Sequence, residues 1–219
     1  MLTDLRLTLA PGAAPDAIVL SAVVLAAGMS RRMEGRDKLL LDVGGEPMIR
    51  RTVRNVLAIA PAETIVVTGH RAAAVEAALA GLAVRHVHNA AHEQGQPTSV
   101  AAGVRALSAY CQAVMVVLGD QPLVAPDDLL ALVTAYRDAG RGSILVPHHQ
   151  GRRGNPILFA ARHIPAVIGG GLNVGCRHLI EDHADEVARV EFARDVYTLD
   201  CDTPDDYARL AARMKAEAK

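Results

Sequence analysis

The sequence predicts an α/β protein built around a mostly parallel, mixed central sheet. Three stretches of aliphatic and β-branched residues, 18–25, 64–68 and 114–118, are typical of strands buried on both faces. Between and after them, residues 47–59, 71–79, 98–107 and 126–139 show the spacing of amphipathic helices. The last of these begins with Pro126 and stops before Gly140, the expected start and stop residues of a helix. Alternation of strand and helix predicts βαβ units with right-handed crossovers.

After residue 140 the pattern becomes less regular. Short strands are expected at 143–146 and 155–159, on either side of a GRRG turn, and at 187–192 and 196–199. Residues 204–216 begin with a proline and are expected to form a helix near the C-terminus. Because no repeat, low-complexity tract or linker interrupts the chain, we assign residues 18–219 to one domain and residues 1–17 to a variable lead-in.

Composition narrows the range of functions. The 219 residues are 51% hydrophobic and 21% charged, which allows a large core. A net charge of −1 argues against a nucleic-acid partner bound mainly by electrostatics. No apolar run is long enough to span a bilayer, and residues 1–17 lack the basic start and compact apolar segment of a signal peptide. We therefore expect a cytoplasmic protein with neither a nucleic-acid nor a membrane partner.

The cysteines and histidines give only weak indications of a metal site or a catalytic residue. Cys111, Cys176 and Cys201 are odd in number and form no CxxC pair, so neither a disulfide framework nor a zinc site is indicated. Partly buried small side chains are favoured over a catalytic thiol. His86 and His88 would share one face of a strand and could ligate a metal. Without a neighbouring Cys or Glu to complete the set, the surface of an edge strand is the favoured interpretation.

The loop after the first strand has the character of a phosphate site. Small residues at 26–28 allow close approach of a ligand to the backbone, whose N–H groups can surround phosphate oxygens. Arg31, Arg32 and Lys38 would balance the charge of a triphosphate. The competing interpretation is an ordinary glycine turn with a solvated basic face. The loop is neither a Walker A motif nor GxGxxG.

Two aspartates follow expected strands. Asp120 comes two positions after 114–118, and Asp202 comes three positions after 196–199. Ligands of open α/β sheets bind beyond the carboxyl ends of the strands, where two such carboxylates could hold Mg²⁺. The alternatives are a turn aspartate before Pro122 and a helix N-cap before Pro204. Residues 68–70 and 95–99 could line the same pocket, with a plain turn and a plain helix cap as alternatives.

Taken together, six segments resemble the MobA-like nucleotidyltransferase superfamily, and most closely its molybdenum cofactor cytidylyltransferase (MocA) branch. In chain order they are LAAGMSRRMEGRDKLLL, VVTGH, EQGQPTSVAAGV, LGDQPLV, GRRGNPILF and LDCDTPDDY. They cover most of residues 20–210 in the order of the family. Each segment is weak alone, but jointly they are quite specific.

The resemblance implies a Rossmann-like, GT-A-type fold and transfer of CMP from CTP to the phosphate of molybdopterin, with release of pyrophosphate. Ala27 favours the cytidylyl branch, which tends to carry LAAG where the guanylyl branch tends to carry LAGG. Catalysis is expected from Arg32, Lys38 and Asp120, and Mg²⁺ binding from Asp120 and Asp202. The implied nucleotide contacts are Leu25, Ala26, Ala27, Gly28, Ser30, Arg31, Arg32, Lys38, Thr68, Gly95 and Ser99. The implied acceptor contacts are Arg153, Gly154, Pro156 and Arg177.

One segment departs from the family pattern. Where relatives usually carry an aspartate, this chain has Val174, although Arg177 is retained. The departure affects the identity of the acceptor more than that of the nucleotide. Alternatives are guanylyl transfer, another phosphorylated acceptor, a MocA-like oxidoreductase, for which no GxGxxG is present, and a cofactor chaperone. A molybdoenzyme of the xanthine dehydrogenase type is a candidate recipient.

Overall fold

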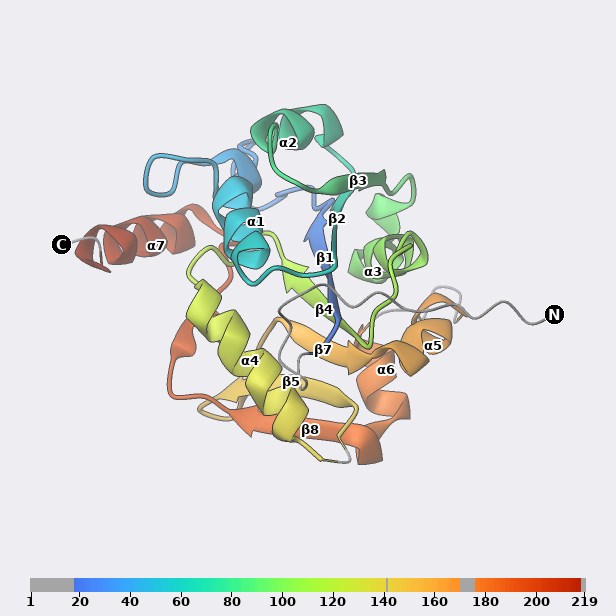
Figure 1. Cartoon of the computed structure of the whole chain (residues 1–219). Coiled ribbons are helices and arrows are strands. Elements are labelled where there is room, and N and C mark those ends of the chain that lie inside the picture. The colour runs from blue at the N-terminus through green and yellow to red at the C-terminus, as the bar shows by residue number, and fades with distance from the viewer. Residues whose placement is uncertain (1–17, 141, 170–175, 218–219) are drawn as a thin grey trace.

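The computed structural model describes residues 18–140, 142–169 and 176–217. Its eight-stranded sheet has the order β3-β2-β1-β4-β7-β5-β6, with β8 paired to β5 (Figure 1). Strands β1 to β4 are parallel, β7 is antiparallel to both β4 and β5, and β8 is parallel to β5. The strands are β1 (Leu20–Ala26), β2 (Glu63–Thr68), β3 (Arg85–His88), β4 (Ala113–Leu118), β5 (Ile144–His149), β6 (Arg152–Arg153), β7 (Ile157–Ala160) and β8 (Val187–Glu191). The expected mostly parallel, mixed α/β sheet is confirmed.

Helices cover both faces of this sheet (Figure 1). On one face lie α1 (Met48–Ala58), α2 (Ala72–Ala78), α4 (Pro126–Asp138) and α7 (Pro204–Glu217). On the other lie α3 (Gln96–Arg105), α5 (Ile164–Gly169) and α6 (Cys176–Asp182). Short 3-10 turns connect them: η1 (Lys38–Leu40), η2 (His92–Gln94), η3 (Ala161–His163), η5 (Ala184–Glu186) and η6 (Asp195–Thr198).

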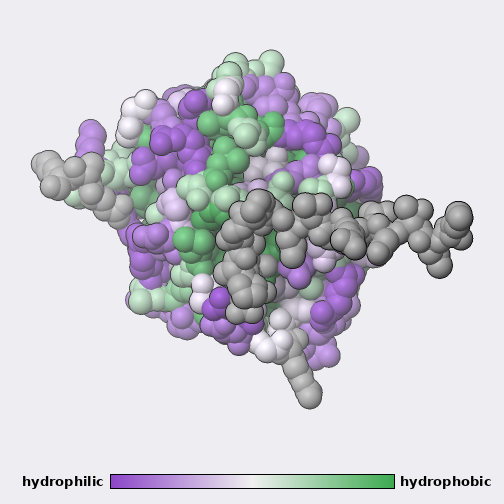
Figure 2. Space-filling view, viewed as in Figure 1, coloured by the Kyte–Doolittle hydropathy of each residue, from purple (hydrophilic) through white to green (hydrophobic). Residues whose placement is uncertain are grey.

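Burial explains why β1 has no polar alternation. All seven of its residues are buried, because Ala22 and Val24 pack under α1 while Val23 and Leu25 pack under α3. Full burial of one such valine contributes about 1.5–3 kcal/mol. Outside the core, Figure 2 shows a mainly hydrophilic face with a narrow hydrophobic band through its middle. No helix in the described ranges combines the length and the apolar character needed to cross a membrane.

Helix α3 approaches the sheet closely because it carries a glycine at the contact. A Cβ on Gly103 would overlap Val23 Cγ1 and would lie 2.7 Å from Val67 Cγ2. Side chains at this position would push the helix away from β1 and β2. The glycine therefore allows α3 to pack close to the sheet. The segment before the N-terminus of α3 is thereby held near the ends of the strands.

Glu63 at the start of β2 ties down the turn that follows α3. Its carboxylate accepts hydrogen bonds from the backbone N–H of Ser108 and Ala109 at 2.9 and 3.1 Å, and from the Ser108 hydroxyl at 3.0 Å. Arg85 Nη2 adds an ion pair at 2.6 Å. Although burial alone would raise it, these donors lower the pKa of Glu63 to about 2.

The structure replaces one expected strand by a 3-10 turn, adds two helices, and places the short strand β6, Arg152–Arg153, in the expected GRRG turn. Residues 196–199, expected as a strand, belong to the 3-10 turn η6 followed by one extended residue. Val196 and Tyr197 are consecutive and both fully buried, which a half-exposed strand does not allow, and the Thr198 hydroxyl closes the turn on Asp195 O at 2.9 Å. Helices α5 and α6 were not expected. The remaining expected helices and strands are present, with ends shifted by three residues or fewer.

The histidine pair lies where the favoured interpretation put it. His86 and His88 belong to β3, the edge strand of the sheet. His88 is exposed and His86 is half-buried. Among the described residues, neither belongs to a cluster of three possible metal ligands.

Candidate functional site

A cavity of about 820 Å³ opens at the carboxyl ends of β1 and β4. This volume lies within the range of small-molecule sites. The lining combines the loop after β1, the segment before α3, the end of β4 with Asp120, and parts of the C-terminal third. Its residues are Leu25, Ala27, Gly28, Met29, Ser30, Arg31, Arg32, Lys38, Leu39, His92, Glu93, Gly95, Gln96, Leu118, Asp120, Arg153, Asn155, Arg177, Asp200 and Asp202.

Local contacts hold the loop after β1 in shape. Ser30 has a positive φ of 48°, and its hydroxyl accepts the backbone N–H of Lys38 at 3.2 Å. Asp37 caps η1 by accepting the N–H of Leu39 at 3.1 Å. Met33 is fully buried and anchors the middle of the loop in the core. The loop therefore directs Lys38 into the cavity by contacts that the sequence carries within nine residues.

Two aspartates distant in sequence converge on Lys38. Its Nζ contacts Asp120 Oδ2 and lies 2.8 Å from Asp202 Oδ1, and Arg32 Nη2 lies 2.6 Å from Asp202 Oδ2. The Lys38 side chain is only 14% exposed. Burial alone would lower the pKa of Lys38, but the charges and hydrogen bonds of the two carboxylates raise it above its ordinary value. For Asp202, burial is outweighed by Lys38 and Arg32, so its pKa is lowered.

This convergence tests whether the site fits a divalent cation. Asp120 and Asp202 both contact the same positive group, the ammonium of Lys38. Two carboxylates that share one cation match the donor set with which Mg²⁺ is usually held beside substrate phosphates. The residues present therefore fit a divalent metal, with the Lys38 ammonium as its stand-in.

The residues next to Asp202, rather than Asp202 itself, cap helix α7. Thr203 Oγ1 accepts the N–H of Asp206 at 3.2 Å, and the Asp206 carboxylate accepts the N–H of Thr203 at 2.9 Å. This reciprocal pair is a capping box at the start of α7. The Asp202 carboxylate is therefore free to face Lys38 and the cavity.

Sequence reasoning missed Asp200 as a lining residue. Asp200 and Asp202 both line the cavity, whereas Cys201 between them is fully buried. Burial, with the nearby charges of Asp120 and Asp202, raises the pKa of Asp200. The signal was the DCD triplet, since residues two apart in an extended chain point to the same side. His92, Glu93, Gln96 and Asn155 were missed too, although each lies in or beside a recognised segment.

Five expected site residues lie behind the lining rather than in it: Ala26, Thr68, Ser99, Gly154 and Pro156. Thr68 is fully buried and donates to Glu76 Oε1 at 3.3 Å. Ser99 is buried too, and its hydroxyl accepts from Asn89 Nδ2 at 3.0 Å. Neither side chain is part of the cavity lining. The other expected residues line the cavity.

The C-terminal third supplies two arginines to the lining. Arg153 and Arg177 both line the cavity, with Asn155 beside Arg153. Burial, together with the charge of Arg177, lowers the pKa of Arg153. Arg177 is exposed and pairs with Glu181 at 3.1 Å. The departure at Val174 lies outside the described residues.

The thiols are poorly suited to catalysis. Cys111, Cys176 and Cys201 are all buried. Burial raises the pKa of Cys176 to about 12 and that of Cys201 to about 11. A thiol must ionise to act as a nucleophile, so these values favour the small-side-chain interpretation.

Solved structures with the same architecture include a nucleotidyl transferase and a synthetase complexed with CTP. A nucleotidyl transferase from Methanothermobacter thermautotrophicus superposes with a TM-score of 0.75 at 28% identity, covering 91% of this chain and 99% of its own. Rv0371c of Mycobacterium tuberculosis in complex with manganese superposes with a TM-score of 0.72 at 25% identity, covering 88% and 98%. A synthetase complexed with CTP, at 17% identity and a TM-score of 0.69 over 90% of this chain and 99% of its own, shows only the shared fold.

Sequence comparison also places the chain among nucleotidyltransferases. The bifunctional protein GlmU of Anaeromyxobacter sp. strain K is 40% identical over 124 residues, which are 55% of this chain but 25% of GlmU. GlmU of Dinoroseobacter shibae is 39% identical over 126 residues, or 57% of this chain and 28% of GlmU. The match thus spans about a quarter of these relatives. The profile of the MobA-like NTP transferase domain matches residues 22–187, so the chain belongs to this family of nucleotidyltransferases.

Proposed function

We propose that this protein transfers CMP from CTP to the phosphate of molybdopterin and releases pyrophosphate. The observation that carries nucleotidyl transfer is the meeting of Lys38, Asp120 and Asp202 at one point of the cavity. The choice of CTP rests on the resemblance of the LAAG segment, in which Ala27 marks the cytidylyl branch. The choice of molybdopterin rests on the resemblance of GRRGNP and on the arginines at 153 and 177.

The loop after β1 is the proposed triphosphate site. Gly28, Ser30, Arg31 and Arg32 line the cavity beside Lys38. Backbone N–H groups and guanidinium groups both favour phosphate oxygens. In the structure Lys38 and Arg32 are paired with carboxylates. When nucleotide binds, we expect both cations to exchange these partners for the phosphates.

Asp120 and Asp202 would hold the metal, which we propose to be Mg²⁺. When bound, that ion supplies Lewis-acid charge neutralisation worth several kcal/mol in the transition state. The manganese complex of Rv0371c supports a divalent cation in this fold. Asp200 also lines the cavity, and burial, with the charges of Asp120 and Asp202, raises its pKa.

The reaction would be an in-line displacement at the α-phosphorus of CTP. A terminal phosphate oxygen of the acceptor forms the new P–O bond, and the bond to the departing pyrophosphate breaks. The nucleophile is already anionic, so no general base is required. The chain would therefore act by positioning the two substrates and by neutralising charge with Arg32 and Lys38.

The acceptor would bind between the two arginines and Asn155. Arg153 and Arg177 offer guanidinium groups, which suit a phosphate better than an ammonium does. We propose the cytoplasm as the location and a molybdoenzyme of the xanthine dehydrogenase family as the recipient. Both proposals rest on the resemblance alone.

The test is release of pyrophosphate from CTP or GTP, with molybdopterin and Mg²⁺ present and with each omitted in turn. We expect release only with CTP and the complete mixture. A preference for GTP would mean that GTP, not CTP, is the nucleotide donor. Release of pyrophosphate with another phosphorylated acceptor, but not with molybdopterin, would mean that molybdopterin is not the acceptor. Tight pterin binding without pyrophosphate release would indicate a carrier. A nicotinamide absorbance change that needs no CTP would indicate an oxidoreductase.

Asp120→Asn is the matched test of the metal assignment. We expect a loss of about 10³-fold in kcat, from the several kcal/mol attributed to the ion. Asp138→Asn is the control, because Asp138 is 62% exposed at the end of α4 and touches only the neighbouring Arg137 among the contacts described. Full activity of Asp120→Asn in the presence of Mg²⁺ would contradict the assignment.

A further inference from the structure

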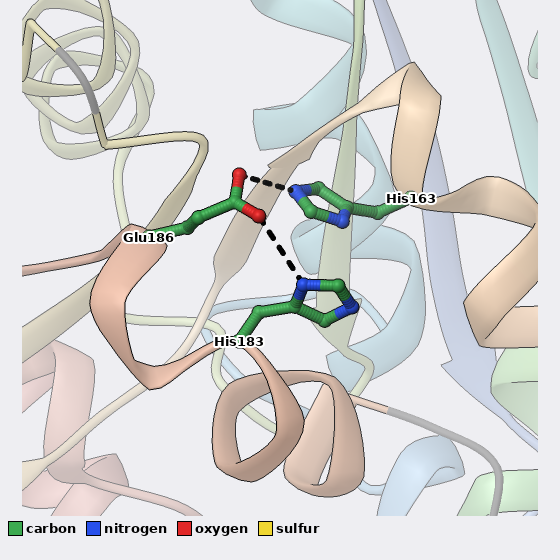
Figure 3. A group of neighbouring side chains, drawn as sticks. All are labelled: His163, His183 and Glu186. Atoms are coloured by element: carbon green, nitrogen blue, oxygen red, sulfur yellow. Dashed lines mark hydrogen bonds and ion pairs between the residues drawn. The ribbon is translucent and has the colours of Figure 1, made fainter.

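A second cluster of metal-binding side chains lies outside the nucleotide cavity. His163, His183 and Glu186 come from η3, the residue after α6, and η5, and they point toward one another (Figure 3). Their ligand atoms all lie within 4.8 Å of one another. Glu186 Oε2 is 3.5 Å from His163 Nε2, and Glu186 Oε1 is 3.2 Å from His183 Nδ1. None of the three lines the nucleotide cavity.

We propose that these three residues bind a transition-metal ion of the zinc class. Two imidazoles and a carboxylate are a donor set that suits Zn²⁺, with a water in the fourth position, and imidazole nitrogens do not suit Mg²⁺. In a tetrahedral zinc site with metal–ligand distances of about 2.0–2.1 Å, neighbouring ligand atoms lie about 3.4 Å apart. Each imidazole nitrogen lies at close to that spacing from one oxygen of the Glu186 carboxylate, His163 Nε2 at 3.5 Å from Oε2 and His183 Nδ1 at 3.2 Å from Oε1.

The neighbours of the cluster are compatible with a bound ion. Ser143 Oγ donates to Glu186 Oε2 at 2.5 Å and lies 2.7 Å from His163 Nε2, so in this state that nitrogen donates its proton to the hydroxyl. Metal binding requires the neutral tautomer with the proton on Nδ1, which costs no change of charge. Arg162 pairs with Glu186 at 2.6 Å. A carboxylate has enough lone pairs to keep that contact while it ligates a metal.

The location indicates what the ion does. Strand β5 runs parallel to β4, because both are antiparallel to β7. Ser143 precedes β5 and Asp120 follows β4, so the two sites lie at opposite ends of the strands. The ion would join η3, η5 and the end of α6 rather than take part in catalysis. Because α6 presents Arg177 at its other end, the ion would also steady that arginine at the cavity.

The test is Zn²⁺ binding to the full chain after chelator treatment, measured by calorimetry with Mg²⁺ in excess to occupy oxygen-donor sites. We expect one Zn²⁺ per chain and a higher Tm with Zn²⁺ than without it. His183→Gln should weaken binding by more than about tenfold and abolish the rise in Tm, since even the loss of an outer-shell partner costs about 10–100-fold. His183 is 33% exposed, so the variant should fold.

His178→Gln is the matched control. His178 lies on α6, pairs with an acidic residue three positions on, and is 40% exposed, but it does not belong to the cluster. It should bind Zn²⁺ as the natural protein does. Asp120→Asn, which removes a carboxylate of the nucleotide cavity, should also leave Zn²⁺ binding unchanged. Absence of Zn²⁺ binding, or equal binding by His183→Gln, would overturn the proposal.

Discussion

Gly154 lies where three segments of the nucleotide site meet, and Gly154→Ala tests their packing. A Cβ at this position would lie 2.5 Å from the carbonyl oxygen of Tyr197 and 2.9 Å from its Cβ. That oxygen accepts hydrogen bonds from the N–H of Asn155 at 2.8 Å and from Gln121 Nε2 at 3.2 Å. Gln121 follows Asp120, and Asn155 lines the cavity. Relief of the clash must therefore move at least one wall of the site.

The magnitude follows from these distances. Ordinary van der Waals contact begins at 3.4 Å, so the Tyr197 carbonyl and Gly154 must separate by about 0.9 Å. Tyr197 is 1% exposed and its hydroxyl donates to Asp128 O at 3.0 Å, which leaves it little room to move. Overpacking costs about 1–3 kcal/mol and each weakened hydrogen bond about 1 kcal/mol. We expect a loss of about 2–4 kcal/mol in the free energy of unfolding.

The assay is chemical denaturation together with transfer kinetics. A displacement near 1 Å at Arg153 and Asn155 should lower transfer by about 10–100-fold, with a raised KM for the acceptor. Gly169→Ala is the control, because Gly169 is exposed at the end of α5 and a Cβ added there would meet nothing within 4 Å. It should be neutral or stabilise by up to about 1 kcal/mol. A Gly154→Ala variant within about 0.5 kcal/mol of the natural protein, with full activity, would refute the reasoning.

Three further predictions follow from single contacts. Asp120→Asn should weaken Mn²⁺ binding by about tenfold or more in the presence of nucleotide, as followed by electron paramagnetic resonance; unchanged binding would count against the metal site. Glu63→Gln should lower the free energy of unfolding by about 1–3 kcal/mol at pH 7. Because the pKa of Glu63 is lowered to about 2, this contribution to stability is present above pH 4.5 and is lost as the pH falls toward 2. Equal losses of stability at pH 7 and at pH 2 would be inconsistent with the assignment. Arg194→Ala should cost about 1–3 kcal/mol in urea denaturation, since Arg194 holds the 5% exposed Asp128 at 2.7 and 2.8 Å, whereas Arg137→Ala should change stability by less than about 0.5 kcal/mol.

The elements of the parallel half could be predicted because each carries its own signal. Apart from Ser21, strand β1 is an unbroken run of apolar residues, because both its faces are covered. The ends of α4 are indicated in the sequence by Pro126 and Gly140. The C-terminal third was harder. Turn η6 alternates like a strand in sequence, yet Val196 and Tyr197 are both buried because α4, α7 and the sheet surround them. Such burial is a tertiary property that the local pattern does not contain.

By itself, the sequence determined the alternation of strands and helices, the basic loop after the first strand and the family resemblance. Only the tertiary structure decided that Lys38 meets Asp120 and Asp202, which lie 82 and 164 positions away. In the tertiary structure Thr203, rather than Asp202, caps α7, so the Asp202 carboxylate can face the cavity. The fold also places the two histidines of the second cluster beside Glu186. For Lys38 and Asp120 the physical reason is that a parallel sheet gathers the carboxyl ends of distant strands on one side of the molecule. Contacts between residues this far apart in the sequence leave no periodic trace in the chain.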